Sequence, residues 1–275
     1  MKNVMGVVVA FLMVASNAFA AVQYEYFQTI RSDVQDMPAS NLNARAVLDG
    51  QRTRVDFISG NTYPPGTYVI SNDASKRLLF VDPTQKSYTE VNTLGIASAI
   101  ATSGITITNL QADVAKLSDS QVIAGIPADH YRLTITYDIT VAFRTLPLKQ
   151  SVRTIIDKWT TVRYGDVGDA SLAGTVQTGN QKVDELITDE TQKIRGFPLK
   201  QTVQIVTINQ SGAAAESKLR LPASRTMTRE MTVTSIADVR TDDALFRIPA
   251  DYRKVDFNDQ ITKSQTQVLS TTPAQ

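Results

Sequence analysis

The chain contains a single histidine, and it is the first residue to consider for chemistry. His130 follows Asp129, and a carboxylate beside an imidazole could form the pair that general acid–base catalysis uses. His130 also begins a segment in which polar and apolar residues alternate, a pattern that predicts a β-strand. Adjacent side chains on a strand point to opposite faces, so Asp129 is poorly placed to orient the imidazole. The pattern therefore favours a histidine on the water-facing side of a sheet over a catalytic histidine.

Three acidic groups are the other candidates for chemistry. Asp242–Asp243 precedes an apolar triplet, which is typical of a turn or a cap, and Asp184–Glu185 fits the solvated side of a helix. Asp166–Asp169 lacks the alternating oxygen ligands and the final glutamate of a calcium-binding hand. The sequence also lacks a glycine-rich phosphate cradle and a nucleophile elbow. It therefore predicts a protein that is not an enzyme and has no metal site and no cofactor.

Composition narrows the chemistry further. The absence of cysteine excludes disulfides, thiolate metal sites and a cysteine nucleophile, and one histidine excludes a histidine-rich metal site. The chain has 28 lysines and arginines against 27 aspartates and glutamates. A net charge this close to zero gives no electrostatic reason to expect nucleic acid or an anionic membrane as a partner.

The first 20 residues predict export. Lys2 precedes an uncharged, mostly apolar stretch from Val4 to Ala15, and Ala18 and Ala20 place small residues where signal peptidase reads them. The alternative is an N-terminal membrane anchor, but the apolar stretch is shorter than the roughly 20 residues that span a bilayer. We expect a signal peptide over residues 1–20, cleavage after Ala20, and a soluble periplasmic protein with no stable membrane span.

The strongest structural signal is the alternation over His130–Val141. Because every second side chain of a strand points the same way, this segment has one apolar face and one polar face. A strand of this kind is typical of an antiparallel sheet that meets water on one side. The apolar members are Tyr131, Leu133, Ile135, Tyr137, Ile139 and Val141.

Shorter segments on both sides of this one also predict strands. They are bounded by turn residues, such as the hairpin pair Asp49–Gly50, and their regular spacing indicates an antiparallel meander. The segments are Tyr24–Ile30, Leu42–Leu48, Arg52–Phe57, Tyr68–Ser71, Arg77–Val81, Ser87–Val91, Gln150–Trp159, Gln201–Asn209 and Arg225–Ile236.

Two segments interrupt the strands. Asn180–Arg195 has apolar residues at helical spacing and is followed by Gly196, a usual helix stop, so it predicts an amphipathic helix that lies on the apolar face of the sheet. Thr93–Thr102 is small and apolar and fits either a helix or a loop. The fold class is mainly β (α+β), with one domain over residues 21–258 and a disordered polar tail over residues 259–275.

The order of several short motifs carries a family resemblance. The motifs are Gly50–Phe57, Tyr68–Ile70, Leu79–Pro83, Lys86–Tyr88, Ala124–Pro127, Gly196–Leu199 and Leu245–Tyr252. Their order resembles exported bacterial domains of unknown function whose sheet is similar to the half-barrel of the LolA/LolB lipoprotein carriers. The resemblance implies a large curved antiparallel sheet, with one or two helices covering its concave apolar face. No cargo-receiving residue of the carriers can be matched to a position of this chain.

The resemblance and the one-sided sheet suggest two functions. The first is a soluble, non-catalytic periplasmic protein that binds an apolar ligand, a lipid or an acylated protein, in a half-barrel cavity. The alternative is a cell-envelope module that binds another protein and no small ligand; a hydrolase is the least favoured reading. The same aromatic and aliphatic residues could instead fill an ordinary core. The candidates for lining the apolar cavity are Tyr131, Leu133, Ile135, Tyr137, Trp159, Leu186 and Phe197.

Overall fold

The fold is taken from a computed structural model of the chain, which describes residues 21–34, 38–93, 95, 104–143, 146–165, 180–210 and 222–256. The predicted signal peptide, most of Thr93–Thr102, the Asp166–Asp169 segment and the predicted polar tail lie outside these ranges. Those four expectations therefore stay predictions.

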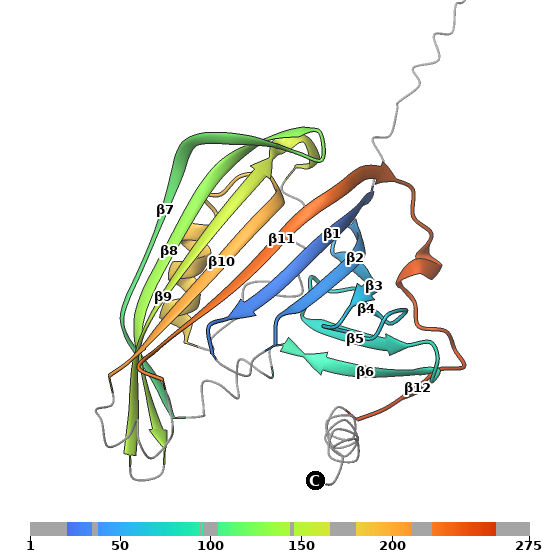
Figure 1. The fold of residues 1–275 in the computed structure, drawn as a ribbon. Helices are drawn as coiled ribbons and strands as arrows, with labels where there is room; N and C mark the ends of the chain where they lie inside the picture. Colours follow the sequence, from blue (N-terminus) through green and yellow to red (C-terminus); the bar gives the residue numbers. More distant parts are fainter. Residues whose placement is uncertain are drawn as a thin grey trace, which may run out of the picture.

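One large, curved sheet of twelve strands dominates the molecule (Figure 1). Its spatial order is β12-β6-β5-β4-β3-β2-β1-β11-β10-β9-β8-β7, and every pairing is antiparallel except that of β12 with β6. This confirms the mainly β class with a helix beside the sheet. The strands are β1 (Ala21–Ser32), β2 (Ser40–Asp49), β3 (Arg52–Gly60), β4 (Tyr68–Ser71), β5 (Arg77–Asp82), β6 (Ser87–Asn92), β7 (Ile105–Ile123), β8 (Ile126–Phe143), β9 (Leu146–Thr161), β10 (Phe197–Asn209), β11 (Ser224–Val239) and β12 (Arg253–Lys254).

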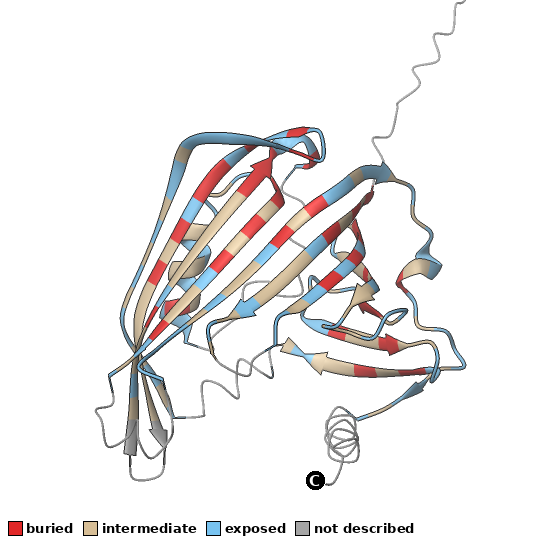
Figure 2. Cartoon of the chain, in the orientation of Figure 1, coloured by how far each residue is buried: buried red, intermediate tan, exposed pale blue. Residues whose placement is uncertain are grey.

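The alternating segment forms most of β8, and its two faces differ as the sequence predicts. Tyr131, Leu133 and Ile135 are buried, whereas Arg132 is exposed and Thr134 is partly exposed. The same alternation continues across β9, β10 and β11 as bands of buried and accessible residues (Figure 2). We call the side of β7–β11 that carries Tyr131 and Leu133 the apolar face, and the side that carries Arg132 and Thr134 the polar face.

β1 and β2 close their part of the sheet tightly. Ala44 and Ala46 are 0% exposed, and they lie opposite Tyr26 and Tyr24 on β1. Each large ring is thus paired with a small side chain, and all four residues are buried. The Tyr24 ring also meets Phe197 edge to face at 5.1 Å, which joins β1 to the beginning of β10 in one core.

The C-terminal segment that contains Phe246 packs against β3–β6 and forms a second, smaller hydrophobic cluster there. Phe246, from the short helix η2 (Asp243–Phe246), packs in a cluster with Ile70, and its carbonyl accepts a hydrogen bond of 3.1 Å from Asn72 Nδ2. The Asp242 carboxylate accepts from the Ala244 amide at 2.9 Å and caps η2. This confirms that Asp242–Asp243 is a cap.

The predicted amphipathic helix is α2 (Gln181–Thr191), which lies against β7. Asn180 caps it by accepting from the Val183 amide at 3.4 Å, and Val183 is its one buried residue. The helix ends earlier than predicted: residues 192–194 form a turn and a bend before Gly196. A single helical turn, η1 (Val162–Tyr164), follows β9.

The sequence did not predict two of the strands, the two-residue β12 and the long β7. The omission of β7 is the more consequential. β7 lies at one edge of the sheet, and its pairing with β8 shifts register twice, between Thr108 and Gln111 and between Lys116 and Ser120. Asn109, within the first irregularity, has a φ of +53°. Each bulge breaks the period of two that identifies a strand in a sequence.

Replacing Gly196 with alanine should destabilise the protein more than the same change at Gly66. Both glycines have positive φ, +89° and +84°, so alanine strains the backbone at each by about 1 kcal/mol. At Gly196 an added Cβ would also lie 2.5 Å from the Thr161 carbonyl oxygen, whereas at Gly66 it meets nothing within 4 Å. Urea unfolding should show an extra loss of about 2 kcal/mol for G196A; equal losses would contradict the close approach of β9 and Gly196.

Candidate functional site

The single histidine lies in a cluster of charged side chains on β7, β8 and β9. His130 Nδ1 is 2.8 Å from both carboxylate oxygens of Asp119, and Nε2 is 3.0 Å from Asp157 Oδ1. The imidazole also stacks on the Trp159 indole, with ring centroids 4.1 Å apart. Asp129 is engaged elsewhere, with its carboxylate 2.8 Å from Lys116 Nζ.

The prediction of a water-facing histidine is therefore wrong, since His130 is 5% exposed. It does lie on the polar face, but three neighbours cover it there: the Trp159 ring, the Asp157 side chain and the Asp119 carboxylate from the irregular part of β7. Asp119 lies on β7, eleven residues before His130 in the sequence. The two side chains meet only because β7 pairs with β8. The expectation that Asp129 does not orient the imidazole is confirmed.

The charged and polar side chains of the cluster form hydrogen bonds with one another rather than pointing toward a substrate. Both ring nitrogens face carboxylate oxygens, and only a doubly protonated imidazolium can donate a hydrogen bond at both. Arg132 adds a two-pronged contact to Asp157, at 2.7 and 3.1 Å. Burial by itself would raise the pKa of Asp157, but the hydrogen bonds from Arg132 and His130 outweigh it and hold the pKa below its ordinary value. The arrangement ties β7, β8 and β9 together and leaves neither ring nitrogen free for acid–base work.

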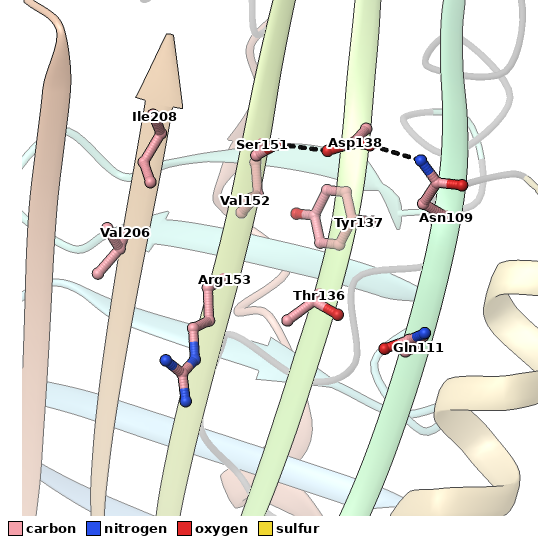
Figure 3. A pocket seen from close by; sticks show the side chains of 10 residues that line it. All are labelled: Asn109, Gln111, Thr136, Tyr137, Asp138, Ser151, Val152, Arg153, Val206 and Ile208. Atoms are coloured by element: carbon pink, nitrogen blue, oxygen red, sulfur yellow. Dashed lines mark hydrogen bonds between the residues drawn. The ribbon is translucent and has the colours of Figure 1, made fainter. Parts of the chain in front are cut away.

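A hollow of about 320 Å³ lies farther along the same strands, on the polar face (Figure 3). The register of β7–β10 places its side chains in two rows that cross the sheet. The first row is Gln111, Thr136, Arg153 and Val206; the second is Asn109, Asp138, Ser151 and Ile208. Tyr137 and Val152 lie between the rows in the sequence and also border the hollow.

The two rows differ in whether their polar side chains form hydrogen bonds with other residues. In the second row, the Asp138 carboxylate accepts hydrogen bonds from Ser151 Oγ and from Asn109 Nδ2, the latter at 2.7 Å (Figure 3). These two donors hold the pKa of Asp138 below its ordinary value, so it stays charged at neutral pH. In the first row, the side chains of Gln111, Thr136 and Arg153 make no hydrogen bond or ion pair with another residue that the structure describes.

The apolar face is less completely covered at this end of the strands. On β8, Tyr137, Ile139 and Val141 are partly exposed, in contrast to the buried Tyr131, Leu133 and Ile135 of the same face. We call the partly exposed residues of this face the apolar strip. Its members are Ile105, Ile107, Tyr137, Ile139, Val141, Ile205 and Met227, and Met227 is 36% exposed.

The predicted cavity residues fall in different surroundings. Trp159 and Phe197 belong to the main core cluster, and Leu186 is partly exposed on α2. Tyr137 belongs to the strip and borders the hollow. Sequence reasoning did not select Asp119, Asp157 or Arg153. The alternation on β9 puts Asp157 and Arg153 on one face, but their neighbours depend on strand register, which the sequence did not supply. The seven candidates therefore remain predictions as ligand contacts.

Comparison with known families supplies the identity of the chain. A family model described as Domain of unknown function (DUF4412) matches residues 34–252. The chain belongs to the DUF4412 family. This confirms the prediction of a family of domains of unknown function. No curated protein matches the sequence.

Several solved structures resemble the DUF4412 chain loosely. An uncharacterized conserved protein from Thermus thermophilus has 10% identity and a TM-score of 0.32, covering 86% of this chain and 91% of that one. A LolA superfamily protein from Nitrosomonas europaea has 10% identity and a TM-score of 0.29, covering 82% and 90%. PNGF-II has 12% identity and a TM-score of 0.35, covering 89% of this chain and 33% of that protein. Among the described residues, no helix has the length and apolar character needed to cross a membrane.

Replacing Asp157 with asparagine should destabilise the protein at pH 7 by about 2 kcal/mol, because the buried His130 ring and the Arg132 guanidinium then lose a carboxylate partner. The matched control is Asp129→Asn, whose exposed ion pair should contribute less than about 1 kcal/mol. Urea unfolding can be followed through the fluorescence of Trp159, which is the only tryptophan and stacks on His130.

The difference between wild type and D157N should shrink in acid. The pKa of Asp157 is lowered in the folded protein, so its stabilising effect is present above its unfolded pKa of about 3.9 and is lost as the pH falls through the folded pKa. Unfolding at pH 7 and at about pH 3 tests this. A difference that is the same at both pH values would contradict a charged Asp157 in the cluster.

Proposed function

We propose that this protein is a non-catalytic periplasmic carrier that binds an apolar ligand, a lipid or an acylated protein, on the apolar face of its curved sheet. The observation that carries the proposal is the contrast between the two halves of the sheet. Where β1 and β2 lie, Ala44 and Ala46 are 0% exposed, whereas the apolar strip on β7, β8, β10 and β11 stays accessible, up to 36% at Met227.

The strip offers a ligand apolar contact and little else. Its members are aliphatic, apart from the Tyr137 ring and the Met227 thioether, and the cross-strand pairs Ile105–Val141 and Ile107–Ile139 place four of them side by side. Burial of an acyl chain contributes about 0.8 kcal/mol per CH₂ group before the ordering of the ligand is subtracted. Affinity of this kind requires no covalent chemistry, which agrees with a histidine whose two nitrogens are both engaged.

α2 is suited to admit such a ligand. It is eleven residues long and lies against β7, the edge strand, and Val183 is its one buried residue. Leu186 and Ile187 on the same helix are only partly buried. A helix held by so few buried contacts is among the parts of a fold that open at the lowest free energy. We infer that α2 moves relative to β7 when ligand enters or leaves. The apolar stretch and small residues of positions 1–20 support the periplasm as the site of action.

An aspartate at Met227 should weaken the binding of an uncharged apolar probe. Met227 lies on the apolar face of β11, opposite Ile205, and the adjacent Thr228 points to the polar face, opposite Gln204. A charge at Met227 would have to be desolvated by the probe, so titration with the fluorescent probe N-phenyl-1-naphthylamine should show at least tenfold weaker binding to M227D. The matched control, Thr228→Asp, should bind like wild type. Equal binding by wild type and both variants would contradict the location.

Native mass spectrometry of protein taken from the periplasm tests the ligand itself. We expect a bound mass that is released by organic solvent and has the composition of a lipid or an acylated peptide. A protein that carries no lipid, takes up none from vesicles and instead retains a specific protein partner in crosslinking from intact cells would overturn the carrier proposal.

A further inference from the structure

We propose that the hollow on the polar face is a second binding site, for a small organic carboxylate with a short apolar body. Its two rows lie on the face of the sheet opposite the apolar strip, because they alternate with Tyr137 along the strand; Tyr137 itself borders both. The proposal rests on which polar groups of the hollow are satisfied and which are not.

Arg153 supplies the positive charge. Two other arginines on the same side of the sheet are bonded to carboxylates: Arg45 to Glu25 at 2.7 Å and Arg132 to Asp157 at 2.7 Å. Arg31, opposite Thr228, also has no carboxylate partner among the described residues, but it does not border the hollow. Arg153 has no such partner among the described residues, and it is one of the residues that border the hollow (Figure 3). A guanidinium presents a planar fork of N–H donors that matches the two oxygens of a carboxylate.

Thr136 and Gln111 extend this donor set across the sheet. The register places Thr136 directly opposite Arg153 and Gln111 directly opposite Thr136. The Thr136 hydroxyl and the Gln111 amide, like the Arg153 guanidinium, make no hydrogen bond with another residue of the described structure. A carboxylate held by Arg153 can therefore accept a further hydrogen bond from the Thr136 hydroxyl.

Asp138 limits where the anion can lie. It stands one row farther along β8 and remains charged, with Ser151 and Asn109 donating to its carboxylate. Asp138 accepts from these two donors, and no ion pair joins it to Arg153 in the described structure. Its negative charge repels a second anion and restricts the ligand's carboxylate to the Arg153 row.

The β10 side of the hollow is apolar. Val206 lies opposite Arg153 and Ile208 lies opposite Ser151, so both rows end in an aliphatic side chain. Ile208 is 50% exposed, among the most exposed large apolar residues of the described chain. A short hydrocarbon body would cover both side chains while its carboxylate meets Arg153. The volume of about 320 Å³ is at the small end for ligand pockets, which fits a small molecule rather than a long acyl chain.

The bulge of β7 shapes the edge-strand side of the hollow. The register shift between Thr108 and Gln111 adds one residue to the edge strand next to Asp138, and Asn109 takes positive φ there. A bulge bends its strand and re-aims the side chains around it. Asn109 thereby reaches Asp138, and the edge strand forms one wall of the hollow.

The test is a titration of ¹⁵N-labelled protein with sodium hexanoate, followed by amide chemical shifts. We expect saturable shifts on the strands that carry Gln111, Thr136, Arg153 and Val206, with millimolar affinity. Acetate carries the charge without the apolar body, and hexanol has the apolar body without the charge; both should bind at least tenfold more weakly. Inorganic phosphate distinguishes a carboxylate site from a general anion site and should also bind more weakly.

Arg153→Gln should reduce hexanoate affinity at least tenfold, and Arg153→Lys should retain part of it, since lysine keeps the charge without the planar fork. Arg45→Gln, on the same side of the sheet but outside the hollow, should bind like wild type. The proposal fails if hexanoate produces no saturable shifts at millimolar concentration, if R153Q binds it as well as R45Q does, or if hexanol or phosphate binds equally. R153Q should still bind N-phenyl-1-naphthylamine, so failure of this site and failure of the carrier proposal are distinguishable.

Discussion

The structure depends on one geometric constraint: side chains on paired strands must keep their alternation in register across a sheet of twelve strands. A slip of one residue would turn Tyr131, Leu133 and Ile135 toward water and bring Arg132 into the core. Register is therefore fixed wherever burial is complete, as at the tyrosine–alanine pairs of β1 and β2. The departures from alternation are few, and the most consequential are the two bulges of β7.

Charge reinforces register where burial is weaker. β7 has little buried surface of its own, and the Asp119–His130–Asp157 cluster bonds it through β8 to β9. These hydrogen bonds are directional, so they form only when the three residues are in the correct register, whereas apolar packing has no such directional requirement. The cluster and the hollow thus follow from one arrangement. The bulged edge strand brings Asp119 over the imidazole at one point, and at another it brings Asn109 to Asp138.

Much of this architecture could be predicted from residue patterns, and the omissions have a common cause. The alternation over His130–Val141, the Asp49–Gly50 hairpin and the Asp242 cap are local signals, and each is present in the structure. β7 was missed because bulges disrupt its alternation. The burial of His130 was missed because Asp119, Trp159 and Asp157 reach it from neighbouring strands. Arg153 was overlooked for the same reason: a solvent-facing arginine is ordinary until register shows which neighbours lack partners.

The edges of the sheet have a further consequence. One edge is β12, a two-residue strand, and the other is β7, nineteen residues long. A long straight edge presents a row of unpaired N–H and C=O groups on which a second molecule can build, and it is a common origin of aggregation. The two bulges divide β7 into shorter runs, and Asp113 and Lys116 place charges between them. The irregularities that hid this strand from the sequence pattern also make it a poor template for polymerisation.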